Sequence, residues 1–301
     1  MVNLLFNTHH HQPIFLPASR LFYPLFYSYV YRVQKEKYEN ASKLIGYAFE
    51  KKQQGEPIDL ESLLMSHGFE SNYTEPMNVL FDKLYRLNEE MTVQNYYEQL
   101  VSEMNFILGG DIVMSKKEGI APIKFGFKPT QSDEHLPMFL SSSAVNQLST
   151  LYLYFKYWAH PENNFLMIDE PEENLHPKNQ IALLNVLLAF AQANNNKVLM
   201  TTHSPLLADA VNNYLYLFWL KSKEIDVHQI VADDYPEMNP DINLSTKDIA
   251  IYFFEGTRMI PYKRGDYGVL FSDFNAELRK IKKIGLVLTE KMSQLLNDDE
   301  E

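Results

Sequence analysis

The sequence predicts an α/β fold with a largely parallel sheet, and three observations support this. Short apolar segments alternate with longer helical patterns through residues 105–301. The segment Phe165–Ile168 is apolar at every position, as expected for a central parallel strand that is covered on both faces. A second such segment, Val198–Thr202, follows after one helix-length stretch, and strand, helix and strand in this order give parallel neighbours.

The composition limits both the size of the core and the class of protein. With 301 residues and 46% hydrophobic content, the chain can bury one large core, or one core with an insertion. The absence of cysteine excludes disulfides and thiolate-bound metals and fits a reducing cytoplasm. No apolar run spans a bilayer and no signal peptide is visible, so we expect a cytoplasmic protein without a membrane partner. A net charge of −12 argues against a surface-wide nucleic-acid footprint.

The amino-terminal third predicts one short strand followed by helices. Ile14–Leu16 is an apolar run between prolines, which favours a strand at a sheet edge. The aromatic residues 22–31 and the charged residues 34–104 favour helices; within the latter, Leu80, Leu84 and Leu87 recur at amphipathic spacing. We therefore interpret residues 34–104 as a helical arm inserted into a sheet domain.

The remaining elements follow from turn and capping signals. A β-hairpin is predicted from two apolar runs separated by a Lys-Lys-Glu-Gly turn, and helices are predicted where proline or serine opens an apolar periodic stretch. The hairpin strands are Phe106–Val113 and Ile123–Phe127, and helices are expected over Ser142–Trp158, from Pro177 to about residue 194, and after Ser204–Pro205. Three further strand-like runs are Tyr214–Leu220, Ile225–Val231 and Ile249–Phe254.

Two acidic residues stand where a parallel sheet binds its ligand. Asp169 and Glu170 directly follow the apolar strand, at its carboxyl end. An aspartate there can hold Mg²⁺ through water, and a glutamate one residue later can orient and deprotonate an attacking water. An acidic loop after a strand would look the same. The histidine at the end of the next strand, His203, can contact a γ-phosphate and favours the catalytic interpretation.

Two further segments admit both a ligand-binding and a plain structural interpretation. Ser141, Ser142 and Ser143 open a helix, where hydroxyl and N–H groups form an anion site or an ordinary N-cap. Asn174, in the loop before Pro177, could cross to a partner subunit in a dimeric ATPase or could simply precede a helix. The residues alone leave both alternatives open.

Together these motifs resemble a known family. Ile168-Asp169-Glu170-Pro171-Glu172, Leu175-His176-Pro177 and Thr202-His203-Ser204-Pro205 are similar to motifs of ABC-type ATPase heads of the SMC, RecF and OLD kind, and most of all to bacterial AAA-like ATPases of abortive-infection and defence systems. Pro17-Ala18-Ser19-Arg20 is similar to their Pro-Ala-x-Arg segment. The stretch 248–254 resembles the strand that closes their sheet.

The resemblance implies a fold, a cofactor pair and a set of roles. Residues 1–301 would form a P-loop-NTPase-like (ABC-type) head with flanking helices, incomplete at the amino terminus, which binds ATP and Mg²⁺ at a dimer interface. Asp169 would be the Walker B metal ligand, Glu170 the base and His203 the switch histidine. Asn174 would lie in the D-loop, and Ser141 to Ser143 in the signature. A nuclease or toxin would be the effector partner, and nucleic-acid binding by the arm rests on family analogy alone.

Two departures from the family pattern matter for activity. The glycine expected in the signature is Ala144, and none of the 11 glycines belongs to a G-x-x-x-x-G-K-[ST] loop. Without that loop, ATP affinity should be poor. We therefore expect a head that takes its P-loop from a preceding segment or a separate polypeptide and that, alone, exposes an open sheet edge. The alternative is a non-hydrolysing interaction or regulatory module, or a truncated remnant.

Overall fold

The computed structural model describes residues 13–21, 27–54, 74–87, 93, 95–115, 124–271 and 279–289. The chain divides into two compact units, residues 1–202 and 203–301, which we describe separately. The three histidines at residues 9–11 and the acidic residues 298–301 lie outside the described residues. No helix among the described residues is long and apolar enough to cross a membrane.

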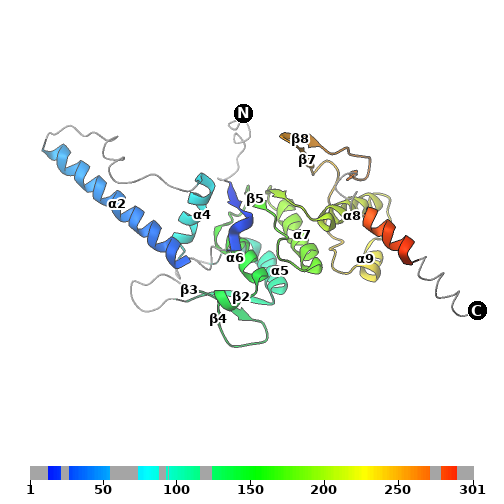
Figure 1. Ribbon diagram of the computed structural model, residues 1–301, viewed down its shortest axis with the longest axis horizontal. Coiled ribbons are helices and arrows are strands. Elements are labelled where there is room, and N and C mark those ends of the chain that lie inside the picture. Colours follow the sequence, from blue (N-terminus) through cyan, green and yellow to red (C-terminus); the bar gives the residue numbers. More distant parts are fainter. Residues whose placement is uncertain are drawn as a thin grey trace, which may run out of the picture. The chain divides into compact units, whose positions relative to one another are not determined.

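The first unit is built around a parallel three-stranded sheet in the order β1-β5-β6, and Figure 1 labels its central strand, β5. The three strands are β1 (Ile14–Leu16), β5 (Phe165–Asp169) and β6 (Lys197–Thr201). The predictions of β1, of β5 as the central strand and of β6 as its parallel neighbour are thereby confirmed. A short 3-10 turn, η2 (Ala18–Leu21), follows β1 directly and contains Arg20.

Helices cover one side of this sheet. They are α5 (Glu98–Leu108), preceded by η3 (Asn95–Tyr97), α6 (Ser143–Leu153), which continues into the π-helical turn η5 (Tyr154–Trp158), and α7 (Pro177–Gln192). Leu148, Leu166 and Phe190 are fully buried between sheet and helices. The predicted helices over residues 142–158 and from Pro177 are confirmed, with Ser142 as N-cap of α6 and His176 as N-cap of α7.

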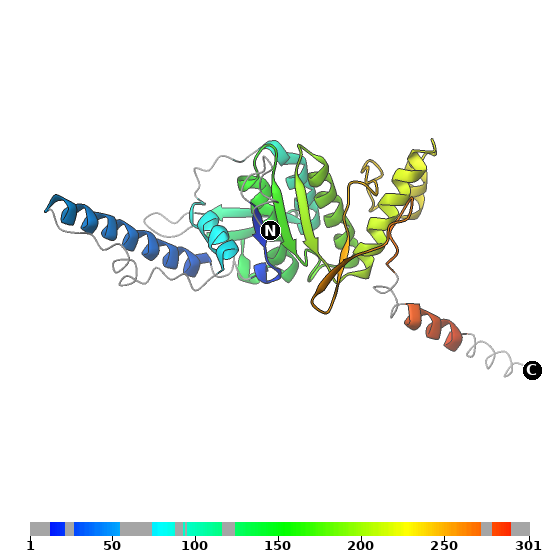
Figure 2. The same cartoon turned by 90° about the horizontal axis from the view of Figure 1, so that it is seen from above.

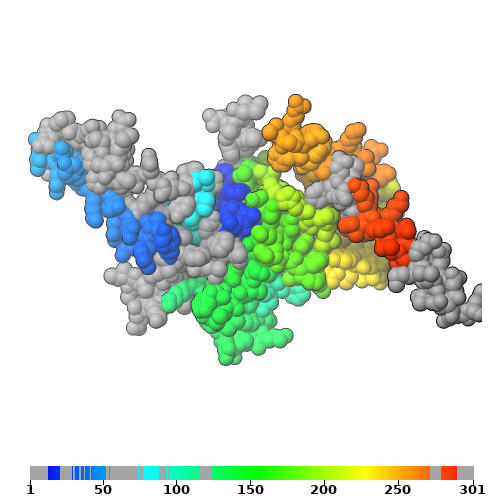
Figure 3. Space-filling view, viewed as in Figure 1, coloured from blue at the N-terminus to red at the C-terminus, as the bar shows by residue number. Residues whose placement is uncertain are grey.

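The region predicted as a helical arm contains two helices before α5. They are α2 (Tyr27–Gln53) and α4 (Glu75–Tyr85). Helix α4 buries Leu80 and Leu84 and packs beside β1, on the side away from β5 (Figure 2). Most described side chains of α2 are exposed (Figure 3), and the helix packs against α4.

A second, antiparallel sheet in the first unit corrects part of the predicted hairpin. Its strands are β2 (Gly110–Ser115), β3 (Lys124–Pro129) and β4 (Leu136–Pro137), and the 3-10 turn η4 (Met138–Leu140) follows. The hairpin is confirmed for β2 and β3, but the prediction was wrong for residues 106–108, which end helix α5. Gly109 ends that helix in the left-handed conformation (φ +69°), a backbone geometry that glycine adopts without strain.

The second unit contains helices where two strands were predicted. Its elements are α8 (Pro205–Lys221), α9 (His228–Asp234), the hairpin β7 (Tyr252–Glu255) and β8 (Arg258–Pro261), and a helical segment at residues 279–289. Ser204 caps α8 as predicted. Tyr214–Leu220 is helical because Val211, Tyr214 and Leu215 continue the buried stripe of α8, and a short apolar run cannot by itself distinguish a buried helix from a strand.

Two other predictions for this unit are corrected. Most of Ile225–Val231 lies in or before α9, where Val227 and Val231 are buried four residues apart, which is helical spacing. The stretch that was expected to close the main sheet contributes β7, which pairs in antiparallel fashion with β8 in a separate hairpin. Apolar alternation therefore identified the strand but not its partner.

A buried amide network fixes the amino-terminal end of β5. Asn164 Nδ2 donates to the carbonyl of His160 at 2.7 Å and to Asn196 Oδ1 at 2.8 Å, and it lies 3.0 Å from the Tyr97 hydroxyl. Both asparagines are buried. The network joins the start of β5, the turn after α7 and the start of α5, and so helps to fix the position of β5 relative to these helices.

We predict that Asn164→Ala lowers the free energy of unfolding by roughly 3 kcal/mol, because it leaves several buried partners without a hydrogen bond. Chemical denaturation of the full chain measures this change. The matched control is Gln192→Ala at the exposed end of α7, which should change stability by less than about 0.5 kcal/mol. Equal effects of the two substitutions would contradict a structural role for the network.

In the second unit, the ring of His228 lies between two carboxylates, 3.1 Å from Asp241 Oδ1 and 3.2 Å from Asp226 Oδ1. These hydrogen bonds raise the pKa of His228 above its ordinary value of 6.5. The stabilisation is therefore complete below the unfolded-state pKa and is lost as pH rises through the folded-state pKa. We predict that His228→Gln destabilises the chain at pH 5.5 but not at pH 9, unlike the exposed control His135→Gln. A pH-independent difference between wild type and His228→Gln would refute this.

Candidate functional site

The candidate site begins with Asp169, the last residue of β5. Because β1, β5 and β6 are parallel, their carboxyl ends meet at one edge, which is where open α/β sheets bind ligands. Asp169 lies opposite Thr201 in the β5–β6 register, and the Thr201 hydroxyl donates a hydrogen bond to the Asp169 carboxylate. The carboxylate is thus oriented by the neighbouring strand while its residue stays partly exposed.

Glu170 follows in a backbone conformation that non-glycine residues rarely adopt. Its φ is +45°, in the left-handed region. Its N–H donates to the Thr201 carbonyl at 3.2 Å, and its carbonyl accepts from the N–H of Glu173 at 3.2 Å. Strain of this kind costs about 1–3 kcal/mol and persists only where surrounding contacts hold it. It turns the chain sharply out of the sheet after Asp169.

Arg20, which is distant in sequence, stabilises this backbone conformation. Its guanidinium is completely buried, with Nη1 2.6 Å from the Asp169 carbonyl and Nη2 3.0 Å from the Glu170 carbonyl. Nη1 also donates to the Pro17 carbonyl, and Nε donates to the Gln147 carbonyl, each at 3.1 Å. One side chain therefore ties together the end of β5, the turn after β1 and helix α6.

The charge of Arg20 is balanced by the carboxylates around it. Burial lowers the pKa of Arg20 from 12.5 to about 10, while Glu173, Glu172, Asp169 and Glu170 oppose that shift. The guanidinium therefore stays charged at neutral pH. Gln147 extends the cluster, since its Nε2 lies 3.1 Å from both Glu173 Oε2 and the Ala18 carbonyl.

Glu172 is the buried member of this acidic turn. It is 7% exposed, and the Thr202 hydroxyl donates a hydrogen bond to it. Thr201 and Thr202 thus each orient one carboxylate of the turn from the end of β6. At the end of β5, the Asp169 carbonyl and both the N–H and the carbonyl of Glu170 form hydrogen bonds, so the backbone of these two acidic residues is held in place.

The structure places the remaining predicted residues at three other positions. Ser142 Oγ accepts from the Val145 N–H at 3.2 Å, so it is an N-cap, and Ser141 Oγ donates to the Met138 carbonyl at 2.6 Å. Ser143 is the first residue of α6. Asn174 is exposed and left-handed (φ +62°) in the loop before α7. His203 opens the second unit, one residue after Thr202. Their ligand-binding roles stay predictions.

Sequence reasoning missed how these parts are held together. The hydrogen bonds of Arg20, Gln147, Thr201 and Thr202 were not foreseen, although the Pro-Ala-x-Arg resemblance singled out Arg20. Arg20 and Asp169 are 149 positions apart. No local spacing rule could pair them.

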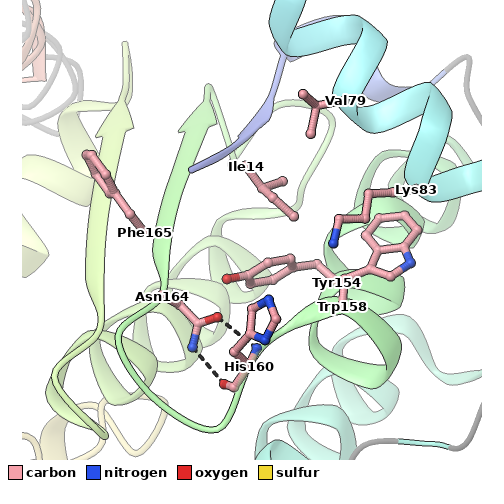
Figure 4. Close-up of a pocket in the computed structure, with 8 residues that line it drawn as sticks. All are labelled: Ile14, Val79, Lys83, Tyr154, Trp158, His160, Asn164 and Phe165. Carbon is pink, nitrogen blue, oxygen red and sulfur yellow. Dashed lines mark hydrogen bonds between the residues drawn. The ribbon is translucent and has the colours of Figure 1, made fainter. Parts of the chain in front are cut away.

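A cavity of about 210 Å³ lies at the other end of the sheet (Figure 4). It is lined by Ile14 and Phe165, the first residues of β1 and β5, and by Lys83, Tyr154 and Trp158. Burial lowers the pKa of Lys83. Because the amino ends of parallel strands face away from Asp169, this cavity is separate from the candidate site. Among the described residues, no group of three or more His, Asp or Glu side chains could hold a metal unaided.

A family model described as "AAA ATPase domain" matches residues 27–208, more than half of the chain. The chain belongs to the AAA ATPase domain family. The matched range includes α6, β5, α7, β6 and the candidate site at Asp169 and Glu170. No curated protein matches the chain.

Membership of the AAA ATPase domain family explains the parallel sheet with flanking helices, which is consistent with a P-loop-like fold. It also indicates ATP as the ligand class and Mg²⁺ as the usual accompanying ion. The residues present fit hydrated Mg²⁺, because this ion is usually held by one or two carboxylates together with water and substrate phosphates. Asp169 at the strand end offers one such carboxylate.

We predict that Arg20→Lys destabilises the chain by roughly 3 kcal/mol, because the three N–H groups of a lysine cannot reach the four carbonyls that Arg20 contacts and leave buried carbonyls without a donor. Denaturant unfolding tests this. Arg86→Lys is the matched control: Arg86 forms an exposed ion pair with Asp82 at 2.7 Å, and its replacement should cost less than about 1 kcal/mol. A small effect at position 20 would mean that Arg20 does not organise the turn.

Proposed function

We propose that this chain is the ATP-hydrolysing head of an ABC-type ATPase whose phosphate-binding loop is supplied from outside these 301 residues. The observation that carries the proposal is the Asp169-Glu170 pair at the carboxyl end of the central strand, with its backbone fixed by Arg20 and Thr201. The family match supports the same activity. The 301 residues contain no G-x-x-x-x-G-K-[ST] loop, so the proposal requires that the phosphate-binding loop come from another segment or polypeptide.

In this proposal Asp169 holds Mg²⁺. Its carboxylate is oriented by the Thr201 hydroxyl and stands at the strand end, where phosphate ligands reach an α/β sheet. When bound, Mg²⁺ would neutralise charge on the phosphates. The contribution of the chain itself is a carboxylate held in one orientation by a bond across two strands.

Glu170 is the proposed general base. Its N–H and carbonyl both form hydrogen bonds, so its backbone is fixed. A fixed backbone limits the positions that the carboxylate can take relative to an attacking water. A base must come within hydrogen-bond reach of the proton it removes, and precise positioning is worth more to it than flexibility. The strained φ of Glu170 is consistent with such a role, because strain collects at functional positions.

The finer assignments complete the proposal. His203 would sense the γ-phosphate, Asn174 would belong to a D-loop, and Ser141 to Ser143 would form a signature facing the nucleotide of another subunit. We propose a dimeric, OLD-like head in a defence or DNA-maintenance system, with residues 34–104 as its inserted arm and a nuclease or toxin as its effector. The motifs of the sequence support these assignments.

Hydrolysis by the completed assembly should depend on the Glu170 carboxylate. We predict that Glu170→Gln lowers ATP turnover by about 10²–10⁴-fold while nucleotide binding is retained, because the amide can accept a hydrogen bond but cannot take the proton. Phosphate release and binding of a fluorescent ATP analogue measure the two properties separately. The control Glu162→Gln, at an exposed position before β5, should leave both unchanged. Undiminished turnover in Glu170→Gln would exclude Glu170 as the base.

A further inference from the structure

The cavity at the amino ends of β1 and β5 is assembled from four elements of the first unit (Figure 4). Its volume is about 210 Å³. An apolar protein cavity of roughly 150 Å³ accommodates benzene, so this volume admits one aromatic ring with a small substituent. The lining side chains that matter below are Ile14 of β1, Phe165 of β5, Val79 and Lys83 of α4, and Tyr154 and Trp158 of η5.

Two of the aromatic residues reach the cavity through the π-helical turn η5. The Ala159 N–H donates to the Tyr154 carbonyl at 2.8 Å, five residues earlier in the chain. Such turns are rare and occur frequently at functional sites. The Tyr154 ring also packs edge-on against the buried Phe190 ring, with centroids 5.9 Å apart. This packing gives the tyrosine a fixed position in the cavity wall.

The same turn carries hydrogen-bond donors that the described residues leave unpaired. Trp158 is 4% exposed, and its Nε1 has no partner among the described residues. Tyr154 is 2% exposed, and burial raises the pKa of its hydroxyl, which therefore stays protonated. Within the described part of the chain, that hydroxyl forms no hydrogen bond. Buried donors without an acceptor are uncommon, because their loss of water is not compensated.

Lys83 brings a positive charge to this cavity. It is partly buried, and burial lowers its pKa. The neighbouring carboxylate, Asp82, accepts hydrogen bonds from Arg86 and from Tyr38. Among the described residues, no hydrogen bond or ion pair holds the Lys83 ammonium group. Figure 4 shows this side chain reaching from α4 toward the side on which Tyr154 and Trp158 lie.

The remaining polar side chain of the strand end does not compensate this charge. Asn164 Oδ1 accepts from the His160 N–H at 2.8 Å, and Nδ2 donates to the His160 carbonyl at 2.7 Å. The cavity therefore combines aromatic walls with an ammonium group and unpaired donors. A neutral aromatic ligand would leave the ammonium group without an opposite charge, and a phosphate ion would leave the apolar walls without a partner. An aromatic ring that bears a carboxylate satisfies both requirements.

We propose that this cavity binds a small aromatic carboxylate. The ring would lie against Ile14, Phe165 and Trp158, and the carboxylate would pair with Lys83 and accept a hydrogen bond from the Tyr154 hydroxyl. The cavity lies at the amino ends of the strands, whereas Asp169 is at the carboxyl end of β5. The inference therefore goes beyond the proposed function and requires no nucleotide.

Fluorescence titration of the full chain with benzoate tests the proposal. The chain contains two tryptophans, Trp158 and Trp219, so Trp219→Phe leaves the indole of the cavity as the only one. Benzoate should change its emission in a saturable way, with a dissociation constant of about 1 mM or lower. The emission of Trp158→Phe, which retains Trp219, should show no saturable change. No saturable change in Trp219→Phe, or a change from Trp219 instead, overturns the proposal.

The role of the lysine charge is tested in the same titration. In the Trp219→Phe background, Lys83→Met should weaken benzoate binding by about tenfold or more, because it removes the ion pair and keeps a side chain of similar length. The matched control is Lys43→Met at an exposed position of α2, which should leave the affinity unchanged. Benzamide has the same shape without the charge, so its affinity should not depend on Lys83. Equal affinity of benzoate for the Lys83→Met and Lys43→Met variants overturns the proposal.

A change of volume places the ligand inside the cavity. Val79→Phe should abolish benzoate binding by filling the space, whereas Val79→Ala should retain it. Thermal unfolding without benzoate shows whether each variant is folded. Benzoate binding by a folded Val79→Phe variant overturns the assignment to this cavity, and if that variant does not fold, the Lys83→Met comparison decides. ATP turnover enters none of these measurements, so this inference and the proposed function fail separately.

Discussion

The buried guanidinium of Arg20 is the contact on which the candidate site depends. Burying a charged group costs free energy unless hydrogen bonds and opposite charges replace its contacts with water. The Arg20 guanidinium donates to four carbonyl oxygens and lies near four carboxylates. The same bonds define the backbone of Asp169 and Glu170. Removing the side chain would leave the four carbonyls without this hydrogen-bond donor and the acidic turn without its nearby positive charge. The charge balance of the turn and its backbone geometry therefore depend on the same side chain.

This constraint makes the segment around β1 part of the site. Pro17 and Arg20 reach the end of β5 because β1 pairs in parallel with β5 and ends at the same edge. The 3-10 turn after β1 contains Arg20, whose guanidinium contacts the carbonyls of Asp169 and Glu170. Gln147 adds a second link, from α6 to both the Ala18 carbonyl and Glu173. Three segments distant in sequence thus meet at a single turn.

The sequence predicted the local parts of this arrangement and missed its long-range contacts. The strands β5 and β6, the start of α7 at Pro177 and the serine-capped start of α8 were recognisable, because each is encoded by a run of adjacent residues. Phe106–Leu108 and Tyr214–Leu220 were misassigned as strands, because short apolar runs fit both a buried strand and a buried helix. The pairing of Arg20 with the carbonyls of Asp169 and Glu170 has no local signal at all. Backbone carbonyls are present at every residue, and only the fold decides which of them meet a guanidinium.

The acidic turn is held by interactions that come from several elements of the first unit. The bonds that fix Asp169 and Glu170 come from η2, α6 and β6, which lie in the same unit as β5. The backbone of these two acidic residues is therefore ordered by the chain itself. A ligand that reaches this end of the sheet would meet carboxylates whose backbone is already in place. Pre-organisation of one side of a complex lowers the cost of association, so the contacts of Arg20 would favour binding as well as stability.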